Sequence, residues 1–208
     1  MTATGFGRRA VLLSLAATVS ACAAPRPTLV HRPRVALLTP LGTIVIEVRN
    51  DVAPLSGGDF LRYVDAGKYT GAHFFRAVRE DNDLSDQKIS VIQAVTAPGV
   101  ESFPPIAHED TRQTGLRHVA GTISLARGAL GTASGATFFI CADASPALDY
   151  GGGRHPDGLG FAAFGQVTAG MDIVRAIQQR RTNGASQSPV MTGQILEQPI
   201  AITRAVRV

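Results

Sequence analysis

Cysteine, charge and long apolar runs are all scarce in this sequence of 208 residues. Two cysteines leave no disulfide framework, because Cys141 lies alone in the apolar segment FFICA and is interpreted as a small buried hydrophobe. Only 17% of the residues are charged, and Lys and Arg form no run interleaved with aromatics of the kind that binds single strands. The apolar run AVLLSLAATV is too short to span a bilayer. We therefore expect neither a disulfide-rich domain nor a nucleic-acid binder.

Motifs for metal binding and for nucleophilic catalysis are also missing. His108-Glu109-Asp110 and His118 lack the close His/Cys spacing of a zinc site. Ser134 does not fit the G-x-S-x-G pattern of a serine hydrolase. The glycines at 151–153 lack the Lys-Ser/Thr and the helix that complete a phosphate loop. The sequence thus predicts no metal and no cofactor.

The N-terminus has the features of an export signal. Arg8-Arg9 precede a short apolar run, and Val19-Ser20-Ala21-Cys22 resembles the lipobox of bacterial lipoproteins. We predict a lipoprotein signal peptide over residues 1–21, a lipid on Cys22, and a location in the cell envelope or periplasm, attached to a membrane. The segment around Arg8-Arg9 partly resembles a twin-arginine signal, so the export route stays open. A start-site artefact or an uncleaved anchor is the alternative.

A proline-rich segment separates this signal from the rest of the chain. Residues 22–33 lack periodicity and predict an extended tether, and a single domain is expected over residues 34–208. Removal of residues 1–21 takes away two arginines and no acidic residue, which leaves 18 basic and 16 acidic residues. This balance does not favour a polyanionic partner.

Turn residues and alternating apolar positions predict a mainly β fold. A hairpin is expected from 35–39 and 43–49, with Ile44, Ile46 and Val48 facing inward. Helices are expected at 53–66 and 170–179, and further strands at 72–78, 88–94, 121–126, 137–142, 162–167 and 200–208. This order predicts a closed eight-stranded antiparallel β-barrel capped by two α-helices, because closure removes exposed sheet edges.

An ordered set of short motifs supports a family resemblance. The segments are TPLGTIVIEV, GKYTGAHFFR, HVAGTISLA, TFFICA, LDYG and FGQVTAGMDIV. In this order they make the chain, from about residue 35 to 206, resemble the cyclophilin family of peptidyl-prolyl isomerases. The resemblance implies a barrel with two capping helices and an active face on one side of its wall. It also implies an isomerase that acts as a monomer on proline-containing peptides and folding proteins.

The resemblance implies individual residue roles as well. Arg76 falls on the catalytic arginine of the family, Ala126 on a backbone contact to the substrate, and Phe139 and Leu148 on the proline pocket. The other substrate-binding positions are Val91, Gln93, Thr137 and Phe161. An arginine suits the reaction, because a fixed donor can stabilise the proline nitrogen as it loses amide resonance.

Several pocket positions depart from the family pattern. Ser90 and Val91 stand where Phe and Met are usual, Thr137 where Gln is common, and Phe161 where His or Tyr is usual. These changes leave open a catalytically weak or inactive proline-binding or chaperone module, and a structural lipoprotein of the cell wall is a third reading. Insertions at 79–87 and 151–160 border the expected groove, and we expect them to alter which flanking residues are accepted.

Overall fold

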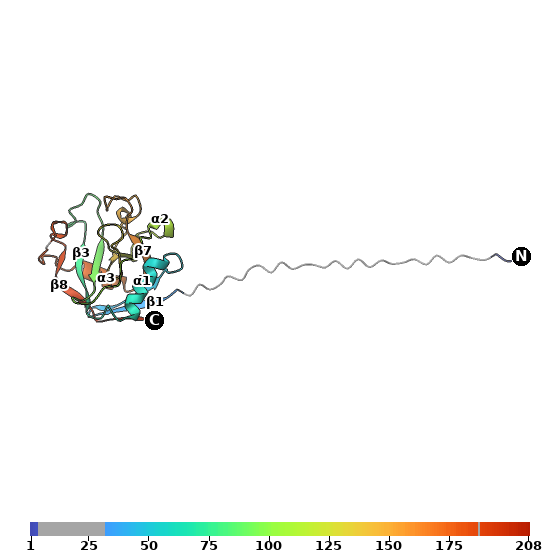
Figure 1. Ribbon diagram of the computed structural model, residues 1–208, viewed down its shortest axis with the longest axis horizontal. Coiled ribbons are helices and arrows are strands. Elements are labelled where there is room, and N and C mark those ends of the chain that lie inside the picture. The colour runs from blue at the N-terminus through green and yellow to red at the C-terminus, as the bar shows by residue number, and fades with distance from the viewer. Residues whose placement is uncertain (4–31, 187) are drawn as a thin grey trace.

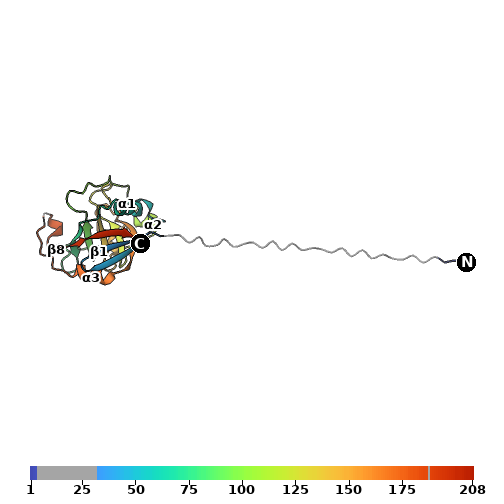
Figure 2. The ribbon, with the colours of Figure 1, turned by 90° about the horizontal axis from the view of Figure 1, so that it is seen from below.

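The computed structural model describes residues 1–3, 32–186 and 188–208 (Figure 1). The predicted signal peptide beyond residue 3, the lipidation site Cys22 and the predicted tether up to residue 31 lie outside the described residues. The N-terminal end of the folded part enters strand β1, close to the C-terminus (Figures 1 and 2). The domain therefore begins and ends on the same side of the molecule.

An antiparallel sheet of nine strands makes up most of the described residues. The strands are β1 (Arg34–Thr39), β2 (Gly42–Val48), β3 (Ala72–Val78), β4 (Val91–Val95), β5 (Thr122–Leu125), β6 (Thr137–Cys141), β7 (Ala162–Ala169), β8 (Ile195–Ile202) and β9 (Arg204–Arg207). Their order in the sheet is β8-β3-β4-β6-β5-β7-β2-β1-β9. The two edge strands, β8 and β9, follow each other in the chain with only Thr203 between them, and the Thr203 amide donates to the Leu38 carbonyl at 2.8 Å. One continuous segment thus nearly closes the barrel.

The strand count differs slightly from the predicted eight. The last predicted strand, 200–208, is divided at Thr203, and β8 begins five residues earlier than predicted, at Ile195. These positions are mostly exposed and include Glu197, Gln198 and Pro199, so no apolar alternation marks them in the sequence. The predicted mainly β barrel is confirmed.

Two helices cap the barrel, as predicted. They are α1 (Pro54–Asp65) and α3 (Met171–Gln178), which lie on opposite sides of the strands in Figure 2. The sequence did not predict the short α2 (Thr111–Thr114) or the 3-10 turns η1 (Pro146–Leu148) and η2 (Pro189–Met191), because three or four residues show no helical period. Among the described residues, none of these helices has the length and apolar character needed to cross a membrane.

Aromatic side chains fill the interior of the barrel. The ring of Phe60 from α1 lies 5.3 Å from Tyr69, 5.5 Å from Phe138 and 5.1 Å from Phe164, measured between ring centroids. All four side chains are fully buried. Helix α1 is therefore fixed to the barrel by aromatic packing, which is among the strongest apolar contributions to a core.

One wall of the barrel is apolar on both faces. In β6, Phe138 and Ile140 belong to the interior, whereas Phe139 and Cys141 belong to a second cluster on the outside. Side chains alternate across a strand, so the FFIC run supplies both clusters at once. Cys141 is fully buried, as predicted, and burial raises the pKa of its thiol.

A β-bulge interrupts this alternation in β3. Phe74 pairs with Ala94 and Arg76 with Gln93, so Phe75 is the extra residue on β3. Phe74 and Ala77 lie in the interior. Without the bulge, Arg76 would share the inward face of Phe74; with it, Arg76 points out of the wall beside Gln93. The bulge thus decides where the arginine lies.

The two phenylalanines of the HFFR motif test this arrangement. Phe74→Ala is expected to lower the free energy of unfolding by about 3–5 kcal/mol, because it empties a fully buried site. Phe75→Ala, at the half-buried position of the bulge, is the matched control and should cost less than half as much. Equal urea midpoints for the two variants would contradict the assigned faces.

Candidate active site

The outward faces of three neighbouring strands form the floor of a groove. Strands β3, β4 and β6 are adjacent in the sheet, and the groove above them has a volume of about 610 Å³. Seven of the eight residues predicted for catalysis and substrate binding line it: Arg76, Val91, Gln93, Ala126, Phe139, Leu148 and Phe161. Residues predicted from distant parts of the sequence therefore meet in one place.

Thr137 is the predicted residue that does not line the groove. It begins β6, two residues before Phe139 and on the same face of the strand, and pairs with Val95. Its carbonyl accepts a hydrogen bond from the Ala126 amide at 3.0 Å. Thr137 thus holds Ala126 in position through its backbone, and a contact between its side chain and a substrate stays a prediction.

An apolar pocket occupies the middle of the groove. The rings of Phe139 and Phe161 meet edge to face with centroids 5.6 Å apart, and Leu148 and Val91 complete its walls. The Phe161 amide donates to the Leu148 carbonyl at 2.9 Å, which joins these two residues. A preformed apolar pocket of this kind suits a small ring.

Ser90, one of the positions that depart from the family pattern, does not line this pocket. Its hydroxyl donates to Asp143 at 2.9 Å and accepts from the Gln178 side chain at 2.7 Å, on the far side of the groove wall. Ile89, one residue earlier, is buried and lines the groove instead. The loop before β4 therefore replaces the expected apolar residue with its neighbour.

Arg76 is a fixed cation at the edge of the pocket. Its Nη1 donates to Oε1 of Gln93 at 2.9 Å, and its Nε donates to Oε1 of Gln194 at 3.0 Å. Burial, with a smaller contribution from the charge of Arg154, lowers the pKa of Arg76 to about 10, so the guanidinium stays charged at neutral pH. In the described part of the chain, no carboxylate forms an ion pair with Arg76. Its charge is therefore held in place without a direct ion pair, and the nearby charge of Asp83 only partly offsets the effects that lower the pKa of Arg76.

Gln194 is a site residue that the sequence did not reveal. It is fully buried, and its Oε1 accepts from both Nε and Nη2 of Arg76. Its Nε2 donates to the Asn82 carbonyl at 3.0 Å, and its own carbonyl accepts from the Ala77 amide at 2.9 Å. It lies 118 positions after Arg76 in an irregular segment, and no local pattern sets it apart.

A buried hydrogen-bonded array supports the pocket from behind. The His118 ring stacks on Phe139, and its two nitrogens lie 2.8 Å from Asp149 Oδ1 and 3.1 Å from Ser124 Oγ. Burial alone would raise the pKa of Asp149, but hydrogen bonds from the side chain and backbone of His118 and the charge of Arg117 hold it below its ordinary value.

The order of hydrogen-bonded groups in this array resembles a catalytic Ser-His-Asp triad, but solvent and substrate have no access to its hydroxyl. Ser124 is 0% and His118 1% exposed, so a substrate cannot reach the hydroxyl. The array orients Phe139. Across the described residues, no group of three or more His, Cys, Asp or Glu side chains is arranged to hold a metal ion.

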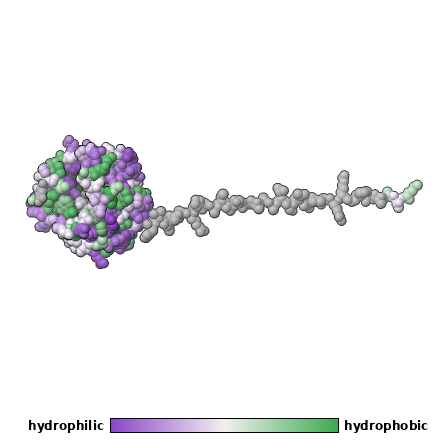
Figure 3. Space-filling model, viewed as in Figure 1, coloured by the Kyte–Doolittle hydropathy of each residue, from purple (hydrophilic) through white to green (hydrophobic). Residues whose placement is uncertain are grey.

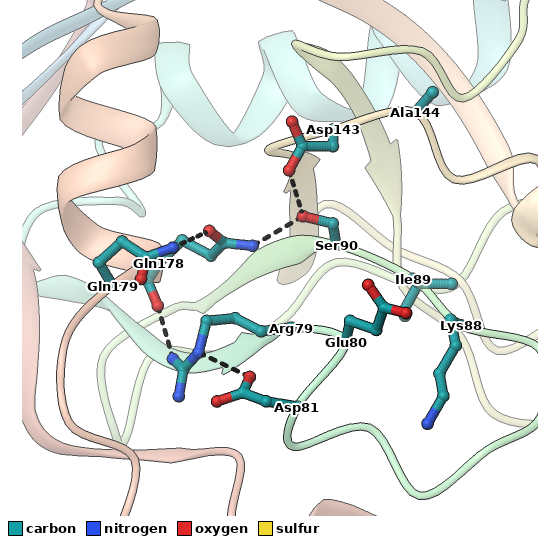
Figure 4. Close-up of a pocket in the computed structure, with 10 residues that line it drawn as sticks. All are labelled: Arg79, Glu80, Asp81, Lys88, Ile89, Ser90, Asp143, Ala144, Gln178 and Gln179. Atoms are coloured by element: carbon teal, nitrogen blue, oxygen red, sulfur yellow. Dashed lines mark hydrogen bonds and ion pairs between the residues drawn. The ribbon is translucent and has the colours of Figure 1, made fainter.

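A second hollow of about 610 Å³ lies next to the groove, and Ile89 lines both (Figure 4). It is polar, and its side chains pair mostly with one another: the Gln178 amide donates to Ser90, which donates to Asp143, and Gln179 donates to Gln178. These bonds join α3 to the residue before β4 and to the loop after β6. We assign this hollow a structural role and no catalytic role.

Comparisons with known proteins agree with this geometry. The pattern of the cyclophilin type peptidyl-prolyl cis-trans isomerase family matches residues 34–204. Peptidyl-prolyl cis-trans isomerase A of Dickeya dadantii is 33% identical over 176 residues, 82% of each chain. The isomerase cyp18 of Streptomyces antibioticus is 32% identical over 151 residues, 73% of this chain and 86% of its own.

Solved structures show the same fold. A cyclophilin type isomerase of Cryptosporidium parvum superposes with a TM-score of 0.62 at 17% identity, over 86% of this chain and 98% of its own. A second structure of that protein, in the presence of the dipeptide Ala-Pro, has a TM-score of 0.61. The chain therefore belongs to the cyclophilin-type peptidyl-prolyl cis-trans isomerases, which confirms the family and the enzyme class inferred from the sequence.

Gln194 offers a test of how Arg76 is positioned. Gln194→Met keeps the volume but removes the acceptor, and we expect kcat for peptide isomerisation to fall about tenfold, equivalent to about 1.4 kcal/mol, with a smaller change in KM. Gln198→Met, at an exposed position of β8, is the control and should match the parent. A Gln194→Met protein with a parental melting temperature and parental kcat would contradict the positioning role.

Proposed function

We propose that this cyclophilin-type isomerase accelerates rotation about exposed X-Pro bonds of exported proteins and so assists their folding in the cell envelope. Arg76 is its catalytic residue. The observation that carries the proposal is a desolvated guanidinium, free of carboxylate partners among the described residues, held beside an apolar pocket. A cation and a ring-sized pocket are what the reaction needs.

The reaction breaks no bond, and its barrier is electronic. Rotation of a peptide bond removes amide resonance against about 18–20 kcal/mol, and an uncatalysed X-Pro bond takes tens of seconds or longer. In the twisted state the proline nitrogen becomes pyramidal and gains a lone pair. A donor aimed at that nitrogen binds the transition state better than either planar isomer. Arg76 supplies N–H groups that are not used by Gln93 or Gln194.

The apolar pocket fixes the part of the substrate that does not turn. Phe139, Leu148 and Phe161 surround a space in which a proline ring would be held while the preceding carbonyl rotates. Ala126, directly after β5, also lines the groove, and because its amide donates to Thr137, its carbonyl is the backbone group left to bind the peptide. The Cryptosporidium isomerase, whose structure was also determined in the presence of the dipeptide Ala-Pro, has the same fold, which supports this assignment.

Export is the second part of the proposal, and it rests on the sequence. The signal-like start and the small residues before Cys22 support a lipid-anchored protein of the envelope. In the sheet order, β1 lies across the nearly closed barrel from β4 and β6. A membrane anchor reached through β1 would leave the groove open to client proteins.

Substitution of Arg76 separates an isomerase from a passive proline-binding module. Arg76→Ala should reduce isomerisation about a hundredfold, since a preorganised donor is commonly worth about 3 kcal/mol. Arg76→Lys keeps the charge but cannot span both glutamine oxygens, and it should recover only part of the rate. Exchange NMR of a proline peptide measures the rates. Equal rates for parent and Arg76→Ala would refute catalysis by Arg76, and peptide binding by an inactive parent would favour the alternative module.

The N-terminus can be examined independently of activity. The membrane fraction of a bacterial host that expresses the full chain should contain a form that begins at Cys22 and carries the mass of an attached lipid. Cys22→Ser should move the protein to the soluble fraction. An unmodified Cys22 in the mature protein, seen by mass spectrometry, would count against lipidation while leaving the isomerase assignment intact.

A further inference from the structure

Beyond the apolar pocket, the groove continues between three loops that contain no β-strand. The loops cover the described residues 79–90, 151–161, and 181–186 with 188–194, and each contributes to the lining. Their lining residues include an apolar set: Leu84, Pro156, Pro189, Val190 and Met191. The groove is therefore longer than a proline ring requires.

Two members of this set are unusually exposed. Leu84 is 71% and Val190 69% exposed, which makes them the most exposed large apolar side chains in the described residues apart from Met1 at the chain end. Exposed apolar residues are common by themselves, and Figure 3 shows several separate hydrophobic patches. What distinguishes these two is that they come from segments about a hundred positions apart and line the same groove beside Arg76.

An ion pair fixes the loop that carries Leu84. Both oxygens of the neighbouring Asp83 carboxylate lie within 3.0 Å of Arg154 Nη1, and that nitrogen also donates to the Gln87 carbonyl at 2.7 Å. The Asp83 carboxylate additionally accepts from the Ile89 amide. The side chains of Asp83 and Arg154 are only 1% and 12% exposed. The pair thus joins the loop of Leu84 to the loop of Pro156.

A second set of bonds fixes Leu84 relative to the segment of Val190. The Asn82 side chain donates to the Gly193 carbonyl at 3.1 Å, and the Asn82 carbonyl accepts from Gln194 at 3.0 Å. Gln194 is also the residue that holds Arg76. The backbone segments that carry these apolar side chains are therefore placed by the same network that places the cation, and a ligand would not have to order those loops.

We propose that Leu84, Val190 and Met191 form an apolar collar that receives a large apolar side chain adjacent to the proline of a client polypeptide. The proposal rests on the proposed function and names its substrate class: X-Pro segments flanked by Leu, Phe or a similar residue. The collar is continuous with the pocket, so a single extended segment occupies both. Burial of one such side chain against the collar favours binding about tenfold or more over alanine.

Peptides that differ at one position test the collar. The series has three peptides of the form Ala-Ala-X-Pro-Z-Ala. One has Leu at X, one has Leu at Z, and one has Ala at both positions. Exchange NMR gives the catalysed rate without a coupling protease, whose own specificity would obscure the comparison, and shift titration gives Kd. We expect the parent to favour at least one Leu peptide about tenfold in kcat/KM. In the double variant Leu84→Ser/Val190→Ser this ratio should fall to about twofold or less.

A matched double variant serves as the control. Leu130→Ser/Val119→Ser makes the same chemical changes at residues that are 56% and 50% exposed and do not line the groove, and it should keep the parental ratio. Equal rates and affinities of the parent for all peptides, or a collar variant with the parental ratio, would overturn the proposal. If the parent bound Leu peptides more tightly but isomerised none of them, the collar would stand and the proposed function would fail.

Discussion

The site depends on the alternation of side chains across one wall of the barrel and on the single place in β3 where that alternation is interrupted. Phe138 and Ile140 support the interior from β6, and Phe139 supports the groove from the same strand. A register shift of one residue would exchange these faces and lose the core and the pocket together. The bulge at Phe75 brings Arg76 to the groove side without disturbing Phe74 in the interior.

The environment of Arg76 explains why its charge remains available. Arg154 is paired with Asp83 and Arg127 with Asp157, each at 2.8 Å, so both arginines act as clamps between segments. Arg76 is instead held by the amide oxygens of Gln93 and Gln194. Neutral acceptors orient a guanidinium but leave its charge uncompensated, and burial strengthens its interaction with any charge that develops on a substrate.

The barrel and the loops contribute differently to substrate recognition. Strands β3, β4 and β6 supply Arg76, Val91 and Phe139, and Leu148 of η1 and Phe161 before β7 complete a pocket that any X-Pro bond can use. The loops after β3, after η1 and before β8 surround this centre and are fixed to one another by polar contacts, including those of Asp83 and Asn82. Loops supported in this way can differ between related proteins without loss of the core. The preference for particular clients is therefore expected to reside in the loops.

The sequence by itself determined the barrel, its two capping helices and seven residues of the groove, because alternating strands and ordered motifs are local signals. Helix α2 and the first half of β8 escaped prediction, since one is too short and the other too exposed to show a period. Only the tertiary structure showed that Ile89 and not Ser90 lines the groove, that Gln194 holds Arg76, and that Leu84 and Val190 line the same groove. These relations join residues far apart in the chain or depend on the direction of a side chain in a loop, and neither is encoded in a local pattern.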